Sequence, residues 1–221
     1  MPLKAKLILL TLIPVVLVSA SISWISIYQT KTLGKREVEI FHQNLIQSKE
    51  AALKDTVDVA FDSISYIYND PTLEESVAKT RVKAILNRLS YGADGYFFAY
   101  DKYGTNLVHP VLPELVGENL LYLEDENGDR LIEALLYQAQ SGGGFHQYLW
   151  QKPSTGEVVP KLSYAAWLDK WEWMIGTGLY IEDVSQEVAN MRAAVNKNIE
   201  TTFFSVVVIL AGTVEIGRAH V

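Results

Sequence analysis

The chain has 221 residues, of which 49% are hydrophobic and 20% are charged, a composition that suits one packed domain with accessory helices. Its formal net charge of −7, without a basic cluster among aromatic residues, argues against a nucleic-acid-binding surface. The absence of cysteine fits an exported domain, and His42, His109 and His146 show no metal-ligand spacing. We therefore predict no metal site, no cofactor and no nucleic-acid partner.

The first element is an apolar run. Residues 7–30 contain no charged side chain, and this length exceeds the roughly 20 residues needed to cross a bilayer core. We predict a transmembrane helix there, after a cytoplasmic N-terminus of residues 1–6. The alternative is a cleaved signal peptide, because residues 18–20 have the small-residue spacing of a cleavage site. The run continues to Trp24 and Tyr28, which favours an uncleaved anchor.

Two helices are predicted next. Apolar residues recur at spacings of three, four and seven from Val38 to Ile67, which indicates one long amphipathic helix that runs on from the apolar segment and ends near residues 69–71. A second helix is predicted over residues 73–89, which begin with an acidic turn.

The period then changes to that of strands. Aromatic and β-branched residues predict strands within residues 95–101 and 106–110, which are joined by a turn at Gly104, and within three later segments. The later segments are residues 145–153, 157–167 and 171–184. Five antiparallel strands with one inserted helix, preceded by a long helix, indicate an α+β fold of the sensor type.

The inserted helix is predicted within residues 125–144, and it ends at glycines. We interpret Asp125 to Asp129, "DENGD", as its cap. A calcium loop is the alternative, but the glycine and distal glutamate spacings are wrong for an EF-hand.

The C-terminal part returns to helical character. Residues 182–200 predict a polar helix that leads into a second apolar stretch, residues 201–214, which we interpret as the start of a second transmembrane helix. The ending Ile216 to Val221 is what the codons ATC GGA AGA GCA CAC GTC encode, and these resemble a widely used sequencing adapter. We therefore interpret residues 215–221 as a non-native tail, with a short natural tail as the alternative.

Lys161 stands out within the strand of residues 157–167 because its neighbours are apolar or aromatic. Side chains alternate along a strand, so Lys161 shares a face with Ser163, and Tyr148 and Trp150 share a face of the partner strand. If these faces coincide, the ammonium group points at aromatic rings. A desolvated ammonium group is costly unless an anion compensates it, and a ligand carboxylate can do so.

Two alternatives stay open for Lys161: its side chain extends to solvent, or it pairs with a protein acid such as Glu157. Tyr148 and Trp150 can supply polar donors and an apolar wall to the same ligand, and ordinary core packing is their alternative.

Three more residues are predicted to contribute to the binding site. His109 precedes Pro110, which favours an extended conformation that leaves a ring nitrogen free to donate to a carboxylate. Tyr96 and Phe98 share one face of the first strand, and we predict that this face lines the pocket. For His109, the alternative is a hydrogen bond in a turn or in the core. For Tyr96 and Phe98, the alternative is that the other face of the strand, which carries Phe97 and Ala99, lines the pocket.

Four separated motifs occur in a fixed order: "DGYFFAYDKYGTNLVHPVLPELVGENL", "GGGFHQYLWQKP", "PKLSYA" and "WMIGTGLYIEDV". In order and spacing they resemble the single Cache domain (sCache type 2) of bacterial methyl-accepting chemotaxis proteins, over residues 31–200. The resemblance implies a periplasmic, PAS-like antiparallel sheet on a long helix, flanked by two transmembrane helices in the inner membrane.

The resemblance also implies a non-enzymatic sensor that binds a small carboxylate such as acetate, propionate, pyruvate or lactate, and a homodimer. A chemotaxis kinase and coupling protein would be partners only through a cytoplasmic region outside this sequence. Two alternatives are the sensor region of a histidine kinase and a ligand-free, anchored dimerisation module.

Overall fold

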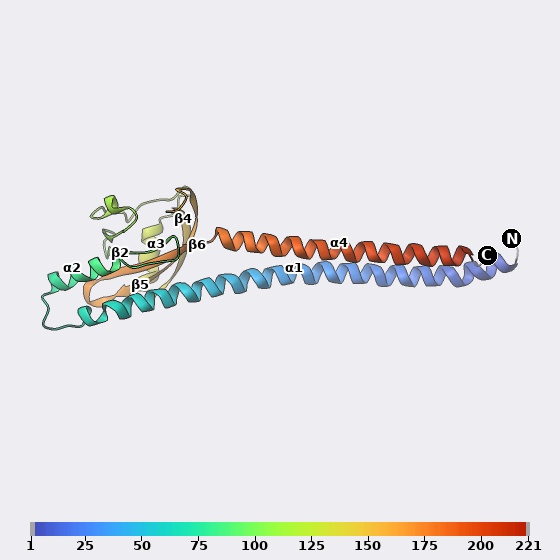
Figure 1. Ribbon diagram of the computed structural model, residues 1–221, viewed down its shortest axis with the longest axis horizontal. Helices are drawn as coiled ribbons and strands as arrows, with labels where there is room; N and C mark the ends of the chain where they lie inside the picture. Colours follow the sequence, from blue (N-terminus) through green and yellow to red (C-terminus); the bar gives the residue numbers. More distant parts are fainter. Residues whose placement is uncertain (1–2, 220–221) are drawn as a thin grey trace. The chain divides into compact units, whose positions relative to one another are not determined.

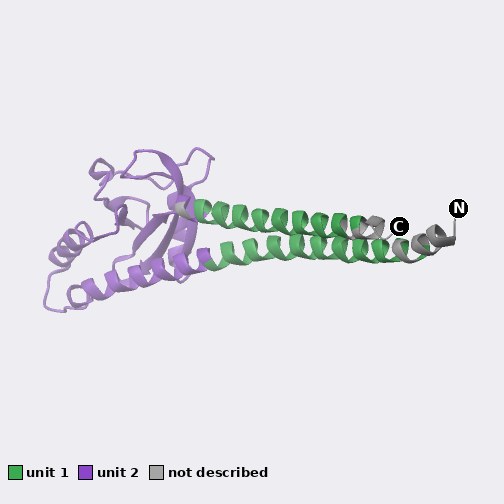
Figure 2. Cartoon of the chain, turned by 45° about the vertical axis from the view of Figure 1, so that its right-hand side comes forward, with its two compact units in different colours: residues 1–44, 185–221 green, residues 45–184 purple. Residues whose placement is uncertain are grey.

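The computed structural model describes residues 3–219, and these residues fall into two compact units. The first unit contains residues up to 44 and from 185 onward, and the second contains residues 45–184 (Figure 2). Residues 220 and 221, the end of the predicted non-native tail, lie outside the described residues.

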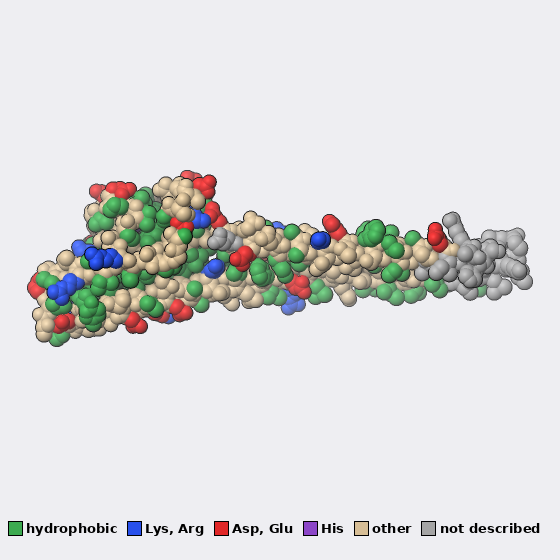
Figure 3. Space-filling model, viewed as in Figure 1, with side chains coloured by type: hydrophobic (Ala, Val, Ile, Leu, Met, Phe, Trp, Pro, Cys, Tyr) green, Lys and Arg blue, Asp and Glu red, His purple; other side chains and the backbone are tan. Residues whose placement is uncertain are grey.

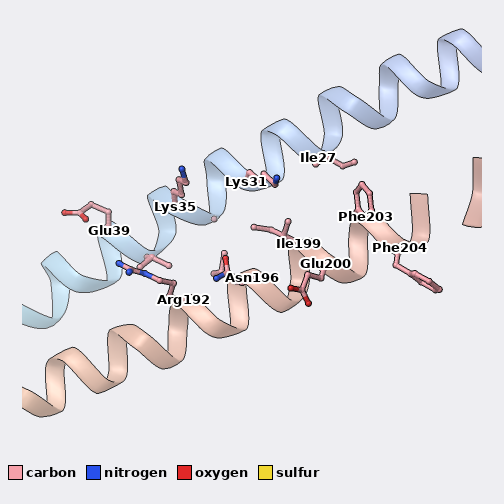
Figure 4. A pocket seen from close by; sticks show the side chains of 13 residues that line it. Ile27, Lys31, Lys35, Glu39, Arg192, Asn196, Ile199, Glu200, Phe203 and Phe204 are labelled. Carbon is pink, nitrogen blue, oxygen red and sulfur yellow. The ribbon is translucent and has the colours of Figure 1, made fainter. Parts of the chain in front are cut away.

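The first unit consists of two antiparallel helices. Helix α1 (Leu3–Tyr68) is continuous from the apolar run to its end, which confirms the predicted long helix, and α4 (Glu182–Ala219) joins the polar segment to the second apolar stretch. At Gly34 the two helices approach closely, because a methyl group there would collide with Val195. Figure 4 shows side chains that line a groove between the two helices, with Lys31 and Phe203 among them.

Helix α1 is long and apolar enough to cross a membrane, the one helix among the described residues that meets this test. Its large apolar side chains, such as Leu17 and Trp24, are exposed in the protein, as are Phe203 and Phe204 of α4. On the face shown in Figure 3, hydrophobic side chains lie along this helix pair. Exposed apolar surface of this extent suits a lipid environment. The second transmembrane helix stays a prediction.

The second unit is an α+β domain around a six-stranded antiparallel sheet (Figure 1). Its helices are the end of α1, α2 (Glu75–Leu86) and α3 (Leu131–Gln140), and its strands are β1 (Ser90–Tyr91), β2 (Gly95–Asp101), β3 (Asn106–Val108), β4 (Gly144–Gln151), β5 (Val158–Leu168) and β6 (Trp173–Tyr180). The order is β1-β2-β6-β5-β4, and β3 pairs with β2. The predicted fold class is thus confirmed, and Gly104, with a φ of 84°, forms the predicted β2–β3 turn.

Two details of the prediction are wrong. The sheet has a sixth strand, β1, whose two residues pair with β2 and are too few to show a period of two. The segment Asp125 to Asp129 does not cap α3, because α3 begins at Leu131 after Arg130, which makes no side-chain cap. Asp125 instead accepts hydrogen bonds from the backbone N–H groups of Asn127 and Asp129, so the segment is a self-closed turn.

Different helices pack on the two faces of the sheet. Helix α3 packs on the face that carries Tyr96, Phe98 and Tyr100, and its own buried residues recur at helical spacing: Leu131, Ile132, Leu135, Leu136 and Ala139. Figure 1 shows the end of α1 running along the sheet, and its buried residues Leu53, Val57, Ala60 and Ile64 form one stripe. The site described below lies under α3.

A single residue, Ile181, separates β6 from α4. Its N–H donates to the carbonyl of Pro160 at 3.0 Å, and the Tyr180 hydroxyl donates to the carbonyl of Gln151 at 2.8 Å. The Nζ of Lys152 lies 2.9 Å from a carboxylate oxygen of Glu182. The last residue of β6 and the first of α4 are therefore fastened to β5 and to the end of β4.

Candidate functional site

All six predicted site residues line one small, buried cavity between the sheet and α3. The cavity has a volume of about 10 Å³, which is roughly the space for one water molecule. Its lining consists of Tyr96, Phe98, Tyr100, His109, Leu131, Ile132, Leu135, Tyr148, Trp150 and Lys161. The polar groups come from the sheet and from the end of β3, and the apolar roof comes from α3.

The strand phase predicted for Lys161 is confirmed. Tyr148 lies directly opposite Lys161 in the β4–β5 register, and Trp150 lies opposite Val159. Directly opposed residues of an antiparallel pair share a face, so Lys161 and Tyr148 project to the same side of the sheet. The hydroxyl of Tyr148 lies 2.9 Å from the Oγ of Ser163, one position further along that face.

Lys161 is buried among aromatic rings. Only 1% of its surface is exposed, which excludes the alternative in which the side chain extends to solvent. Its Nζ donates a hydrogen bond to the Tyr96 hydroxyl at 2.8 Å and lies 5.4 Å from the centroid of the Tyr180 ring. No ion pair with Glu157, or with any other acid whose side chain the structure describes, compensates its charge.

This environment disfavours the charged form of the lysine. Burial lowers the pKa of Lys161 from 10.5 to about 7, and no neighbouring carboxylate raises it again. Neighbouring rings supply a weak compensation through cation–π attraction, since the Nζ lies 4.0 Å from the Tyr96 ring centroid. The site therefore contains a cation whose natural complement, an anion, is not provided by the protein around it.

Two glycines of β6 make this placement possible. Strand β6 lies between β5, which carries Lys161, and β2, which carries Tyr96, so the lysine side chain must cross β6 to reach the tyrosine. It crosses at Gly178, where an added methyl group would lie 2.7 Å from the Cε of Lys161. Gly176 leaves similar room for the ring of Phe98. The alternation Gly-x-Gly in β6 is thus the sequence signal for a side chain that lies flat across the sheet.

We expect Gly178→Ala to destabilise the domain by about 1–3 kcal/mol, because the methyl group would meet Ser163, Lys161 and the backbone of Leu162. Thermal unfolding would show a midpoint several degrees lower. The matched control is Gly212→Ala, where the added methyl group meets nothing within 4 Å. An unchanged midpoint in Gly178→Ala would show that Lys161 does not need this crossing point.

His109 is the second polar contributor, and its hydrogen bond fixes its tautomer. The ring is 2% exposed, and its Nδ1 accepts a hydrogen bond from the N–H of Leu112 at 3.0 Å. Burial, aided by the charge of Lys161, lowers the pKa of His109 to about 4, so the ring is neutral at physiological pH. Because Nδ1 is an acceptor, the proton resides on Nε2, and the ring can act as a donor there.

The aromatic residues form a continuous wall. The rings of Tyr96 and Trp150 flank His109 at centroid distances of 5.1 and 6.0 Å, and Trp150 meets Tyr148 edge-on at 6.2 Å. Burial raises the pKa values of Tyr96 and Tyr148 well above 10, so both hydroxyls stay protonated and can donate.

Four cavity residues were not predicted. Tyr100 continues the period of Tyr96 and Phe98, so extending the strand pattern by one step would have found it. Leu131, Ile132 and Leu135 belong to α3, and their amphipathic spacing predicts a buried face but not the part of the sheet that this face covers.

A family model described as Single Cache domain 2 matches residues 45–194. The chain is 41% identical to the sensor histidine kinase MctS of Rhizobium johnstonii over 95% of this chain and 45% of that protein. It is 29% identical to the methyl-accepting chemotaxis protein CtpM of Pseudomonas aeruginosa over 93% of this chain and 37% of that protein. The chain thus spans less than half the length of these curated relatives.

Solved structures show the same architecture. A methyl-accepting chemotaxis protein from Vibrio parahaemolyticus matches with a TM-score of 0.64 and 38% identity over 67% of this chain and 99% of that one. A Cache chemosensory domain described in terms of carboxylic acid recognition matches with a TM-score of 0.59 and 25% identity. The second match covers 64% of this chain and 99% of that domain.

Proposed function

Because this chain belongs to the Single Cache domain 2 family, whose members are non-enzymatic sensor domains of chemoreceptors and histidine kinases, we propose that it binds a small monocarboxylate in the cavity under α3. The observation that carries the proposal is Lys161, a buried cation without an acidic partner in the described chain. A carboxylate ligand would complete this site with a charge-assisted hydrogen bond.

The other cavity residues define the kind of carboxylate. His109, Tyr96 and Tyr148 offer neutral donors, and the α3 residues offer apolar contacts. One cation suits one carboxylate, and a second carboxylate would be desolvated without a countercharge. The class we propose is therefore a short monocarboxylate with an apolar or weakly polar tail, such as acetate, propionate, pyruvate or lactate.

Affinity in this class is bounded by ligand size. At a ceiling of about 1.5 kcal/mol per heavy atom, a six-atom ligand such as pyruvate gains at most roughly 9 kcal/mol, so we expect micromolar or weaker binding.

The setting we propose is the inner membrane. Cache sensor domains of chemoreceptors are periplasmic, and α1 is able to span a bilayer. We place residues 31–200 in the periplasm, with α1 and α4 leading into the membrane of a homodimer, and assign the signal to α4. The output stays open between a chemoreceptor and a histidine kinase, because relatives of both kinds match nearly the whole chain.

The function is tested by thermal unfolding of the full chain in detergent, followed by intrinsic tryptophan fluorescence, with the four monocarboxylates and with malate. A ligand that binds only the folded state raises the unfolding midpoint as its concentration increases. We expect at least one monocarboxylate to raise the midpoint at millimolar concentration, and malate to raise it less.

The competing function is a ligand-free dimerisation module, which the small volume of the buried cavity favours. It predicts no shift with any of the five acids. That result would overturn the sensor proposal for this ligand class.

A further inference from the structure

An open hollow lies beside the buried cavity and shares two of its walls. The hollow has a volume of about 280 Å³, and Leu131 and Trp150 line both spaces. Leu123 and Asp125 are among the residues that line the hollow but not the cavity. Since the cavity is smaller than any carboxylic acid and its lining is almost entirely buried, a ligand must pass a wall to reach Lys161. Leu131 and Trp150 form a wall that has open space on its far side.

The loop beside this wall, residues 121–130, is termed the cover loop here. It is held to β4, the edge strand of the sheet, at two points. At the first, the Oδ2 of Asp125 accepts a hydrogen bond from the N–H of Leu149 at 2.8 Å. At the second, the Oδ2 of Asp129 lies 2.8 Å from the Nε2 of His146.

The two attachments bracket Tyr148 and lie next to Trp150. His146, Tyr148 and Trp150 occupy alternate positions of β4 on one face, and the His146 ring stacks on the Tyr148 ring at 6.0 Å. The cover loop also leads directly into Leu131, the first residue of α3. Release of the loop from β4 would therefore allow Leu131 to move away from Trp150, which stays paired with β5.

We propose that the ligand enters from the hollow between Leu131 and Trp150, and that the contacts of Asp125 and Asp129 with β4 form the latch that closes this entrance. This inference rests on the proposed function, because it needs a ligand that reaches the cavity. The latch residues Asp129 and His146 do not line the cavity, so they act on the passage of the ligand and not on its contacts.

A latch of this kind has a distinct kinetic signature. In the ligand-free molecule, whose cavity is too small for a ligand, the latch is closed. In our proposal it closes again once a ligand is bound. It therefore stabilises the free closed state and the bound closed state equally. Weakening it then raises the rate of opening in both directions and leaves the equilibrium between free and bound states unchanged. A residue with a direct ligand contact would instead change mainly the dissociation rate and the affinity.

The experiment compares the full chain in detergent with Asp129→Asn, using stopped-flow tryptophan fluorescence with propionate and pyruvate as probes. We expect the association and dissociation rate constants to rise together by about threefold to tenfold, the size of effect of one weakened hydrogen bond, while Kd stays within twofold. The control is Glu172→Gln, which removes the Lys102–Glu172 ion pair at 2.6 Å, far along the chain from the cover loop and outside both linings. Its rates should match those of the unmodified chain.

Amide hydrogen exchange supplies a readout that needs no ligand. The N–H of Leu149 is protected by Asp125, so its exchange should accelerate in Asp129→Asn by about the same factor as association. Unchanged rates, or a change in Kd carried by dissociation alone, would overturn the latch while leaving the sensor proposal intact. Failure of the unmodified chain to bind any monocarboxylate at equilibrium would remove both.

Discussion

Replacing Lys161 with methionine is expected to weaken monocarboxylate binding by at least about 100-fold while leaving the ligand-free domain as stable as before or more stable. Methionine preserves most of the side-chain volume and removes the charge, which is balanced by no acid whose side chain the structure describes. Burying an unpaired ammonium group costs free energy, so its removal relieves the ligand-free fold and deprives the ligand of its countercharge. Calorimetric titration measures the first effect, and thermal unfolding measures the second.

The matched control is Lys102→Met. Lys102 is partly exposed and pairs with Glu172, so its loss should change neither affinity nor the unfolding midpoint by much. Two results would contradict the assignment of Lys161: a variant that keeps its affinity, or a loss of affinity that merely follows loss of the fold. The second is recognised by a lower unfolding midpoint without ligand.

The affinity for the carboxylate is expected to fall by about 100-fold between pH 6 and pH 9. The free lysine has a pKa of about 7, and a bound carboxylate favours its charged form, so binding above this pH takes up a proton. The other groups that face the lysine do not titrate in this window. The pKa of His109 is about 4, and the pKa values of Tyr96 and Tyr180 are raised above 10.

The stability of the ligand-free domain should show the opposite trend. The pKa of Lys161 is lower in the folded state, about 7, than its ordinary value of 10.5, so the unfolded state binds more protons between these values. The contribution of this group to the free energy of unfolding therefore rises as the pH increases from about 7 to about 10.5. Below pH 7 the destabilisation caused by burying the charged lysine is fully present. Measuring affinity and denaturant stability across pH, with Lys161→Met as the reference, isolates both effects. An affinity independent of pH would mean that the lysine stays charged without its ligand.

Strand phase carried most of the site prediction. Once residues 145–153 and 157–167 are taken as paired strands, alternation predicts which residues of each strand share a face. It does not say whether Lys161 and Tyr148 lie on the same side of the sheet, and the observed register shows that they do. His109, Tyr96 and Phe98 were predicted from a strand end and a shared face, and the structure brings them to the same cavity. Whether this cavity binds a ligand is still a prediction.

The remainder depended on tertiary contacts that no local pattern encodes. The two residues of β1 become a strand only because β2 lies beside them, and the turn at Asp125 folds back on β4 instead of capping α3. The burial of the cavity depends on the seating of α3, which is decided by side-chain packing and not by periodicity.

The one-residue junction between β6 and α4 has a mechanical consequence. Glu182 pairs with Lys152, the residue after β4, and Ile181 donates to β5; β4 and β5 are the strands that carry Trp150 and Lys161. A flexible, glycine-rich linker at this point could change its conformation and so absorb small displacements of the sheet. The single residue Ile181 is too short to do this. In the sensor that we propose, a small displacement of the sheet would thus be transmitted to the first turn of α4. The response would then depend on the stiffness of this junction as well as on the affinity for the ligand.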